Sequence, residues 1–201
     1  MKLKNAQKLL ISVGQEMFSR GWVPATSGNF SIRLNNSDIA ITASGKDKGK
    51  LSAKDIICIK CNAYKDAVFD TIAKPSEETL LHLQLYNRDN NINAIIHTHS
   101  VNSIAISEEY PKGLTFSQLE ILKAFSGINT HDSSIYIPVF SNQQNISLLA
   151  GEIECYMKDN NQGFAYLIKG HGVYTWGHDI NECIRYLEVF EYLFEYNQLK
   201  K

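Results

Sequence analysis

Two long segments with helical periodicity enclose a series of short, strand-like segments, and this order constrains the fold most strongly. Residues 3–20 and 179–199 carry apolar side chains at the 3.6-residue spacing of an amphipathic helix. Between them, short apolar segments favour strands at residues 30–34, 38–42, 56–60, 67–70, 94–98, 135–140, 164–168 and 173–176. Further helices are expected at residues 75–88, 102–108, 119–125 and 146–158. Because strands and helices are mixed without a dinucleotide-binding glycine pattern or a regular alternation, we expect one α/β domain over residues 1–201.

The helix expected at residues 179–199 is unusually apolar. Glu188, Glu191 and Glu195 are expected to form its solvated stripe, and apolar side chains cover most of the rest. A helix of this kind is either deep in the core or covered by another subunit.

Charge and cysteine content exclude several classes of protein. The chain has 20 Lys and Arg residues against 21 Asp and Glu residues, a net charge of −1. A nucleic-acid partner is therefore not expected, since such proteins carry a basic surplus. No apolar run approaches the roughly 20 residues that span a bilayer, so no membrane partner and a cytoplasmic location are expected. The four cysteines (Cys58, Cys61, Cys155 and Cys183) are too scattered for a disulfide scaffold and are expected to be free thiols.

A pair of histidines ends one of the predicted strands, in the sequence Ala94-Ile-Ile-His-Thr-His-Ser. Residues i and i+2 of a strand face the same side, so His97 and His99 are expected to lie side by side. Two imidazoles so placed can bind one Zn²⁺, although the pattern also occurs in buried or surface histidines without a metal.

A third histidine, His171, lies between Gly170 and Gly172 in a tight connection between two predicted strands. Its flanking glycines permit unusual backbone angles and close approach to another segment. Considered alone, His171 is also compatible with a residue that only caps a turn. Three histidines on one metal would leave a coordination position open for substrate, which is typical of a catalytic site.

Three short loops offer hydroxyl groups and backbone N–H groups that suit an anion. They span residues 26–29, 43–46 and 74–76, and the last precedes a helix N-terminus, a favourable place for phosphate. Each loop alone is also compatible with an ordinary turn.

Together these segments resemble the class II aldolase/adducin-like family. The resemblance is carried by residues 21–33, 41–46, 74–82, 97–99 and 170–177, whose order and spacing match from about residue 5 to residue 199. It implies a three-layer α/β/α fold with a central, mainly antiparallel (mixed) sheet, usually assembled as a tetramer. It also implies one zinc ion per subunit, held by His97, His99 and His171.

The resemblance further implies an acid/base residue and a phosphate site. Glu120 matches a glutamate that acts as acid/base in dehydrating relatives, and Glu78 matches the base or extra metal ligand of the sugar-phosphate aldolases. The implied phosphate contacts are Gly28, Asn29, Ser44, Gly45 and Ser76, and Ser27 and Lys46 lie next to them in the sequence. Glu77 stands where aldolases have a second small residue, so part of the anion pocket departs from their pattern. His82 is expected to pack or hydrogen-bond, and His131 and His178 to be structural or surface residues.

The activity that the resemblance implies is zinc-dependent dehydration of 5-methylthioribulose 1-phosphate to 5-methylthio-2,3-dioxopentyl phosphate, a step of methionine salvage. Metal polarisation of the C2 carbonyl would acidify the C3 hydrogen, and Glu120 would move the proton toward the leaving C4 oxygen. One alternative is retro-aldol cleavage of a ketose 1-phosphate. Another is a non-enzymatic binding module, since adducin-type heads share the fold.

Overall fold

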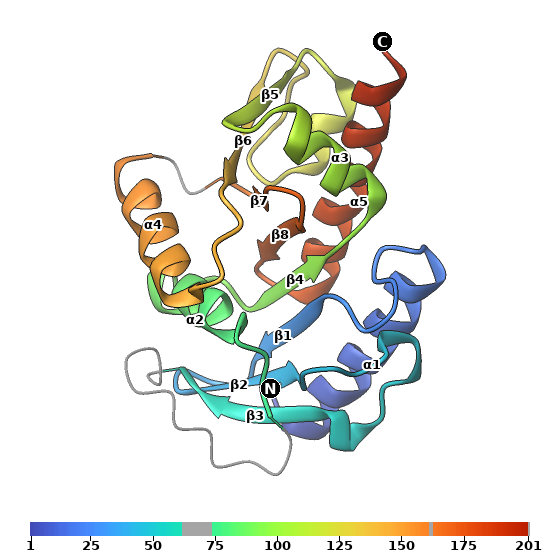
Figure 1. The fold of residues 1–201 in the computed structure, drawn as a ribbon, viewed down its shortest axis with the longest axis vertical. Coiled ribbons are helices and arrows are strands. Elements are labelled where there is room, and N and C mark those ends of the chain that lie inside the picture. The colour runs from blue at the N-terminus through green and yellow to red at the C-terminus, as the bar shows by residue number, and fades with distance from the viewer. Residues whose placement is uncertain (62–73, 161–162, 201) are drawn as a thin grey trace.

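The computed structural model describes residues 1–61, 74–160 and 163–200 (Figure 1). The strand predicted at residues 67–70 lies outside the described residues. None of the helices in the described ranges is long and apolar enough to cross a membrane.

A mixed sheet forms the centre of the molecule. The described strands form one eight-stranded sheet in the order β3-β2-β1-β4-β8-β7-β6-β5. Its neighbouring strands are antiparallel except for β6 and β7, which are parallel. The strands are β1 (Asn29–Arg33), β2 (Asp38–Thr42), β3 (Ile56–Lys60), β4 (Ala94–Thr98), β5 (Gly113–Ser117), β6 (Ser134–Phe140), β7 (Ala165–Ile168) and β8 (Gly172–Gly177).

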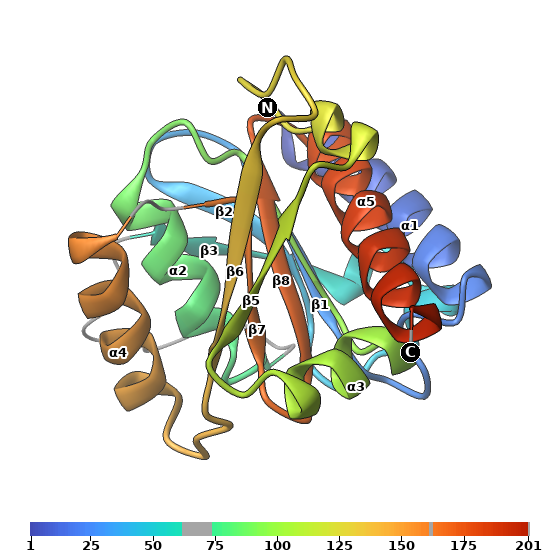
Figure 2. The ribbon, with the colours of Figure 1, turned by 90° about the horizontal axis from the view of Figure 1, so that it is seen from above.

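Helices cover both faces of this sheet. Figure 2 shows α1 (Leu3–Ser19) and α5 (Ile180–Leu199) on one side, with α3 (Val101–Glu109) beside α5. On the other side lie α2 (Thr79–Arg88) and α4 (Ile146–Asp159). The expected three-layer α/β/α architecture with a mainly antiparallel sheet is therefore confirmed.

The central strands are apolar on both faces because both faces are covered. In β4, Ile96 packs in the core beneath α1 and α5, whereas Ile95 packs in the core beneath α2 and α4. The period-2 geometry of a strand thus divides one apolar run between two cores. The uninterrupted apolar segment before His97 is explained by this position at the centre of the sheet.

Several elements differ from the sequence-based expectation. The strand β5 was not predicted, and residues 119–125 form a short 3₁₀ helix over Glu120–Ala124 rather than a longer helix. The helix α2 begins at Thr79, after a turn over residues 76–78.

The expected solvated stripe of α5 is wrong at one position. Glu191 is only 4% exposed, and its Oε1 accepts a hydrogen bond from the Ser100 hydroxyl at 2.6 Å. The physical reason is that α3 packs on this part of α5 and supplies a partner for the carboxylate.

Candidate metal centre

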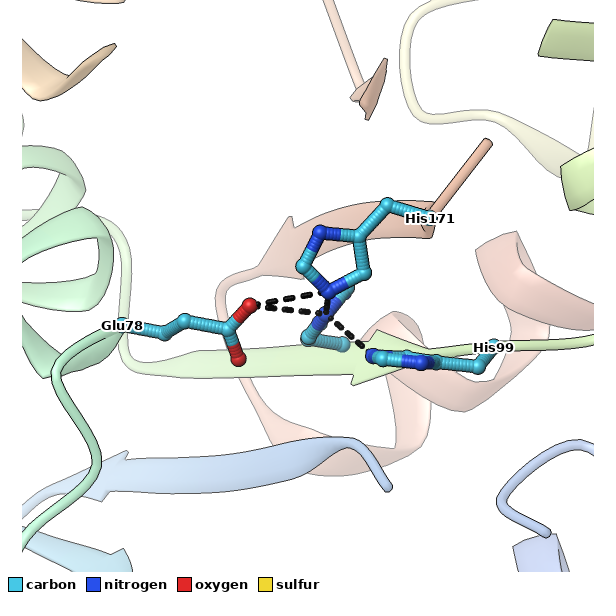
Figure 3. Close-up of side chains that lie close together, drawn as sticks. Glu78, His99 and His171 are labelled. Carbon is cyan, nitrogen blue, oxygen red and sulfur yellow. Dashed lines mark hydrogen bonds and ion pairs between the residues drawn. The ribbon is translucent and has the colours of Figure 1, made fainter. Parts of the chain in front are cut away.

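Four side chains from three separate regions of the chain meet at one point (Figure 3). His97 is in β4 and His99 directly follows that strand, while His171 lies in the turn from β7 to β8 and Glu78 directly precedes α2. One ligand atom from each residue lies within 4.8 Å of the other three. The convergence of the three histidines is therefore present, and Glu78 joins them.

The spacing of these atoms suits a small cation. The Nε2 atom of His97 lies 2.9 Å from Nε2 of His99 and 3.4 Å from Nε2 of His171. Oε1 of Glu78 lies 2.9 Å from Nε2 of His171 and 3.7 Å from Nε2 of His97. Donors at 2.0–2.1 Å from a tetrahedral zinc ion are about 3.3 Å apart, so the observed spacings bracket the required value.

The ring of His97 is held by its surroundings. Its Nδ1 donates to the Val173 carbonyl at 2.9 Å, which leaves Nε2 with a free lone pair. The ring stacks on Tyr174 at a centroid distance of 3.9 Å and is completely buried. A neutral imidazole with its partner nitrogen fixed in this way is typical of a metal ligand.

Two glycines allow the chain to close around the end of β4. A Cβ atom on Gly172 would lie 2.0 Å from the Thr98 carbonyl oxygen. Gly28 has a φ of +73°, and a Cβ atom there would lie 2.6 Å from the His97 carbonyl oxygen. The close approach expected beside His171 is thus found, and a second one occurs at the entry to β1.

The protonation states favour cation binding. Burial lowers the pKa of His97 well below its usual value and that of His99 to about 4, so both rings are neutral near pH 7. Burial opposes ionisation of Glu78, but the adjacent imidazoles of His97 and His171 outweigh it and hold its pKa below the usual range. Neutral nitrogen lone pairs and one carboxylate oxygen form a suitable ligand set for a divalent cation.

The three loops expected to bind an anion lie together near this centre. Ala43 forms an isolated antiparallel bridge with Pro75, and the Ser44 N–H donates to the Lys74 carbonyl. The buried ammonium of Lys48 donates to the carbonyl oxygens of Thr26 and Lys46. Lys48 is the first residue of a short 3₁₀ helix (Lys48–Lys50), and its side chain links the loop before β1 to the loop after β2.

The residues of the expected phosphate site have different environments. The Ser27 hydroxyl is buried and has no hydrogen-bond partner among the described residues, and the Asn29 side chain donates to Glu78. Gly45 has a φ of +69°, and Lys46 forms an ion pair with Asp55 at 3.3 Å. Ser44 and Ser76 line a cavity that also contacts Glu78 and His171.

A cavity of about 340 Å³ adjoins the metal centre. It is lined by Ser44 and Ser76 from the loops and by Glu78 and His171 from the centre. Its other wall contains Asn142, Gln143 and Gln144, from the connection between β6 and α4. These amide residues were not among the expected site residues, although a run of consecutive amide side chains after a predicted strand was a usable signal.

Glu120 belongs neither to the cluster of Glu78 and the three histidines nor to the lining of this cavity. Its side chain is exposed and forms an ion pair with Lys123 at 2.6 Å, within the short 3₁₀ helix that packs on α5. His131 and His178 are also outside the four-residue cluster. His82, by contrast, is completely buried and hydrogen-bonded on both ring nitrogens, as expected.

Comparison with known proteins agrees with this architecture. Two curated relatives are both named methylthioribulose-1-phosphate dehydratase. The protein from Alcanivorax borkumensis is 44% identical over 94% of this chain and 89% of its own length. The protein from Pseudomonas fluorescens is 41% identical over 92% of this chain and 88% of its own length.

Solved structures share the fold at lower sequence identity. An L-fuculose 1-phosphate aldolase superimposes with a TM-score of 0.79 at 21% identity, covering 98% of this chain and 86% of that chain. The L-fuculose-1-phosphate aldolase from Thermus thermophilus gives 0.75 at 21% identity, covering 98% and 97%. The model of the class II aldolase and adducin N-terminal domain matches residues 8–197. With almost its whole length matched, the chain belongs to the class II aldolase and adducin family.

Proposed function

We propose that this chain is a hydro-lyase that dehydrates 5-methylthioribulose 1-phosphate to 5-methylthio-2,3-dioxopentyl phosphate in methionine salvage. The observation that carries the proposal is the convergence of His97, His99, His171 and Glu78 on one point, beside a cavity. Its support from sequence is the 41–44% identity to relatives named for this activity.

The metal we propose is zinc, one ion per chain, because three imidazoles and a carboxylate are ligands that zinc accepts. A divalent cation bound there would polarise the substrate carbonyl and stabilise the negative charge that develops on its oxygen. The three histidines supply imidazole nitrogens, and Glu78 supplies a carboxylate, the one negative charge of the set.

The proposed phosphate site is formed by the loops at residues 27–29, 44–46 and 76. The unpartnered hydroxyl of Ser27 and the cavity-lining Ser44 and Ser76 are available hydrogen-bonding groups. Lys48 adds a positive charge beneath the first two loops. In this arrangement the phosphate would be bound at one end of the substrate and the reacting carbons would lie at the histidines.

Dehydration requires removal of the C3 proton and departure of the C4 hydroxyl, which together leave as water. We propose Glu120 as the group that moves the proton, with Glu78 as the alternative because it already lies among the histidines. Exchanging each glutamate for glutamine distinguishes them. The acid/base variant should lose about 10²–10⁴-fold in turnover per bound metal ion. Metal content is measured for both variants, because Glu78→Gln also removes a carboxylate from the ligand set.

Retro-aldol cleavage is the second candidate, and the position of Glu78 favours it. A glutamate after Pro-Ser-x is the residue expected to act in sugar-phosphate aldolases, and here that carboxylate contacts the histidine cluster. Cleavage between C3 and C4 would release dihydroxyacetone phosphate and an aldehyde instead of a diketone phosphate and water.

Product analysis tests the proposal directly. Purified, metal-analysed protein is incubated with the ketose phosphate, and the products are identified by NMR and mass spectrometry. His97→Ala should abolish both bound metal and turnover, whereas His131→Ala, outside the cluster, should change neither. Release of an aldehyde would show that the protein is an aldolase and not a dehydratase. A protein that purifies without stoichiometric metal would instead be a binding module.

We also propose that the protein is a cytoplasmic homotetramer. Sedimentation measures the number of subunits, and cell fractionation tests the location.

A further inference from the structure

A buried chain of hydrogen bonds leads from the metal centre into the interior. The Asn29 amide nitrogen donates to Oε2 of Glu78 at 2.6 Å, and the Asn29 amide oxygen is hydrogen-bonded to Nε2 of His82. The other ring nitrogen of His82 lies 2.7 Å from the Ser31 hydroxyl, which in turn lies 2.8 Å from the Tyr86 hydroxyl. The side chains between Glu78 and the far end, Tyr86, are at most 3% exposed.

Two elements supply this chain with regular spacing. Glu78, His82 and Tyr86 are separated by four residues each, so they lie along one face of α2 and the turn before it. Asn29 and Ser31 are two residues apart in β1 and therefore face the same side of the sheet. The chain of hydrogen bonds thus fills the contact between a helix face and a strand face.

The negative charge of Glu78 fixes the direction of every hydrogen bond in the chain. An ionised carboxylate only accepts, so Asn29 must turn its NH₂ group toward Glu78 and its oxygen toward His82. Nε2 of His82 must then carry the proton, and a neutral ring has a bare Nδ1. That nitrogen accepts from the Ser31 hydroxyl, whose oxygen accepts from Tyr86.

The environment keeps these groups in the required states. Burial lowers the pKa of His82 to about 3, so its ring stays neutral over the working range of pH. Burial also raises the pKa of Tyr86, which therefore keeps its hydroxyl proton. No member of the chain competes with Glu78 for the negative charge.

We propose that His82 is a positioning residue of the metal centre, acting through Asn29 on the carboxylate of Glu78. In its Nε2–H tautomer, His82 orients the Asn29 amide, and this amide holds Oε2 while Oε1 faces His97 and His171. With Oε2 engaged elsewhere, Glu78 presents a single oxygen to the centre. The inference rests on the proposed function only in taking these four side chains as a metal site.

The tautomer of His82 can be observed directly. Imidazole ¹⁵N NMR of the zinc-loaded protein distinguishes a protonated Nε2 from a protonated Nδ1, and the His82→Gln spectrum identifies the signal. We expect Nε2–H with a bare Nδ1 from about pH 6 to pH 9, given the low pKa of this buried ring. An Nδ1–H tautomer or a doubly protonated ring would overturn the proposal, because Asn29 would then have no donor to orient it.

Metal affinity gives a second test that does not depend on turnover. The affinity for Co²⁺ is measured from its visible absorption for the unaltered protein and for His82→Phe, which keeps an aromatic ring at this site. Removing a group that orients a ligand lowers metal affinity by about 10–100-fold. His82→Gln should recover most of this loss, because its amide nitrogen can replace the Nε2–H donor.

Controls separate positioning from folding. Tyr86→Phe removes a hydroxyl at similar depth on the same helix and leaves Ser31 to donate to His82, so it should change Co²⁺ affinity less than about twofold. If His82→Phe fails to fold, as judged by circular dichroism, Ser31→Ala replaces it. Loss of the donor to Nδ1 should then lower affinity by about fivefold.

The outcomes also separate this inference from the proposed function. If the unaltered protein binds no divalent metal, the proposed function fails. If it binds metal and catalyses dehydration, but His82→Phe binds Co²⁺ as tightly as His82→Gln, only the positioning role fails. A selective loss in His82→Phe that His82→Gln recovers supports it.

Discussion

Individual backbone positions determine how closely the chain segments approach at the metal centre. Gly172 has no room for a side chain, since a Cβ atom would lie 2.0 Å from the Thr98 carbonyl oxygen. Two non-glycine residues with positive φ, Ala25 and Gln118, lie just before Ser27 and Glu120. Strained backbone of this kind clusters at functional sites.

Gly172→Ala should therefore separate the start of β8 from the end of β4. We expect the free energy of unfolding to fall by about 3 kcal/mol or more, since neither backbone can move without breaking strand pairs. Chemical denaturation measures the change. Gly151→Ala is the matched control, because its Cβ would meet nothing within 4 Å and α4 should gain about 0.5–1 kcal/mol. Equal stability of the two variants would contradict the close contact.

Lys48→Met tests the buried positive charge beneath the loops. Its ammonium holds two loop carbonyls, and burial lowers its pKa to about 8. We expect the KM for the sugar phosphate to rise about tenfold or more while metal content stays unchanged, because an ion contact worth 1–3 kcal/mol is lost. The exposed Lys50, changed to Met, serves as the control. A larger effect at Lys50 than at Lys48 would remove Lys48 from the phosphate site.

For individual residues, the sequence predicted the candidate metal ligands better than the residues that hold these ligands in place. His97, His99 and His171 could be identified from their spacing, their flanking glycines and the family resemblance. The roles of Asn29 and His82 could not, because each depends on a partner about 50 residues away in the chain, at separations of 49 and 53 residues. Side-chain spacing within one element does not reveal such a pairing.

Among the elements, α5 shows where periodicity alone is misleading. Glu191 follows the spacing of Glu188 and Glu195 but lies beneath α3. Ser100, the N-cap of α3, donates a hydrogen bond to the Glu191 carboxylate. A helix pattern records which face is apolar, not which polar residue meets a partner on another helix. The missed strand β5 has a similar cause, since its alternation of buried and exposed residues depends on pairing with β6.

Glu191 should make stability depend on pH. Burial raises its pKa from 4.5 to about 7, so between these values the folded state holds a proton that the unfolded chain has lost. The free energy of unfolding contributed by this group therefore falls as pH rises from 4.5 to about 7.

Glu191→Gln should remove that dependence. Relative to the unaltered protein, the variant should gain up to ~3 kcal/mol between pH 4.5 and pH 8, as urea denaturation at a series of pH values would report. Glu195→Gln, one turn further along α5 and exposed, should show a much smaller trend, because the Glu195 charge only adds to the effect of burial on the Glu191 pKa. A difference that does not vary with pH would mean that Glu191 is ionised throughout.

In the whole molecule, the metal centre connects elements from both halves of the chain. The strands β4 and β8 carry or flank the histidines, and the turn before α2 adds Glu78. The mixed α/β class and most elements were predictable from the spacing of apolar residues, whereas the three-layer architecture was expected only from the family resemblance. Strand order was not predictable from the residues alone, because it depends on pairings between distant segments.

Removing the metal should therefore destabilise the whole fold. At free metal about 1,000 times Kd, binding to the folded state alone adds about 4 kcal/mol, which corresponds to a Tm shift of about 10 °C for a domain of this size. Differential scanning calorimetry before and after EDTA, followed by Zn²⁺ addition, measures it. An unchanged Tm would mean that the cation binds the unfolded chain equally well or does not bind at all.

The distribution of the ligands along the chain also has a consequence during synthesis. His171 follows His97 by 74 residues, and the turn that carries it is followed by β8 and α5. A nascent chain on the ribosome therefore exposes Glu78, His97 and His99 well before the last ligand emerges. Full chelation becomes possible only after His171 has emerged, so tight retention of the cation reports that the turn from β7 to β8 has been made and has reached the end of β4.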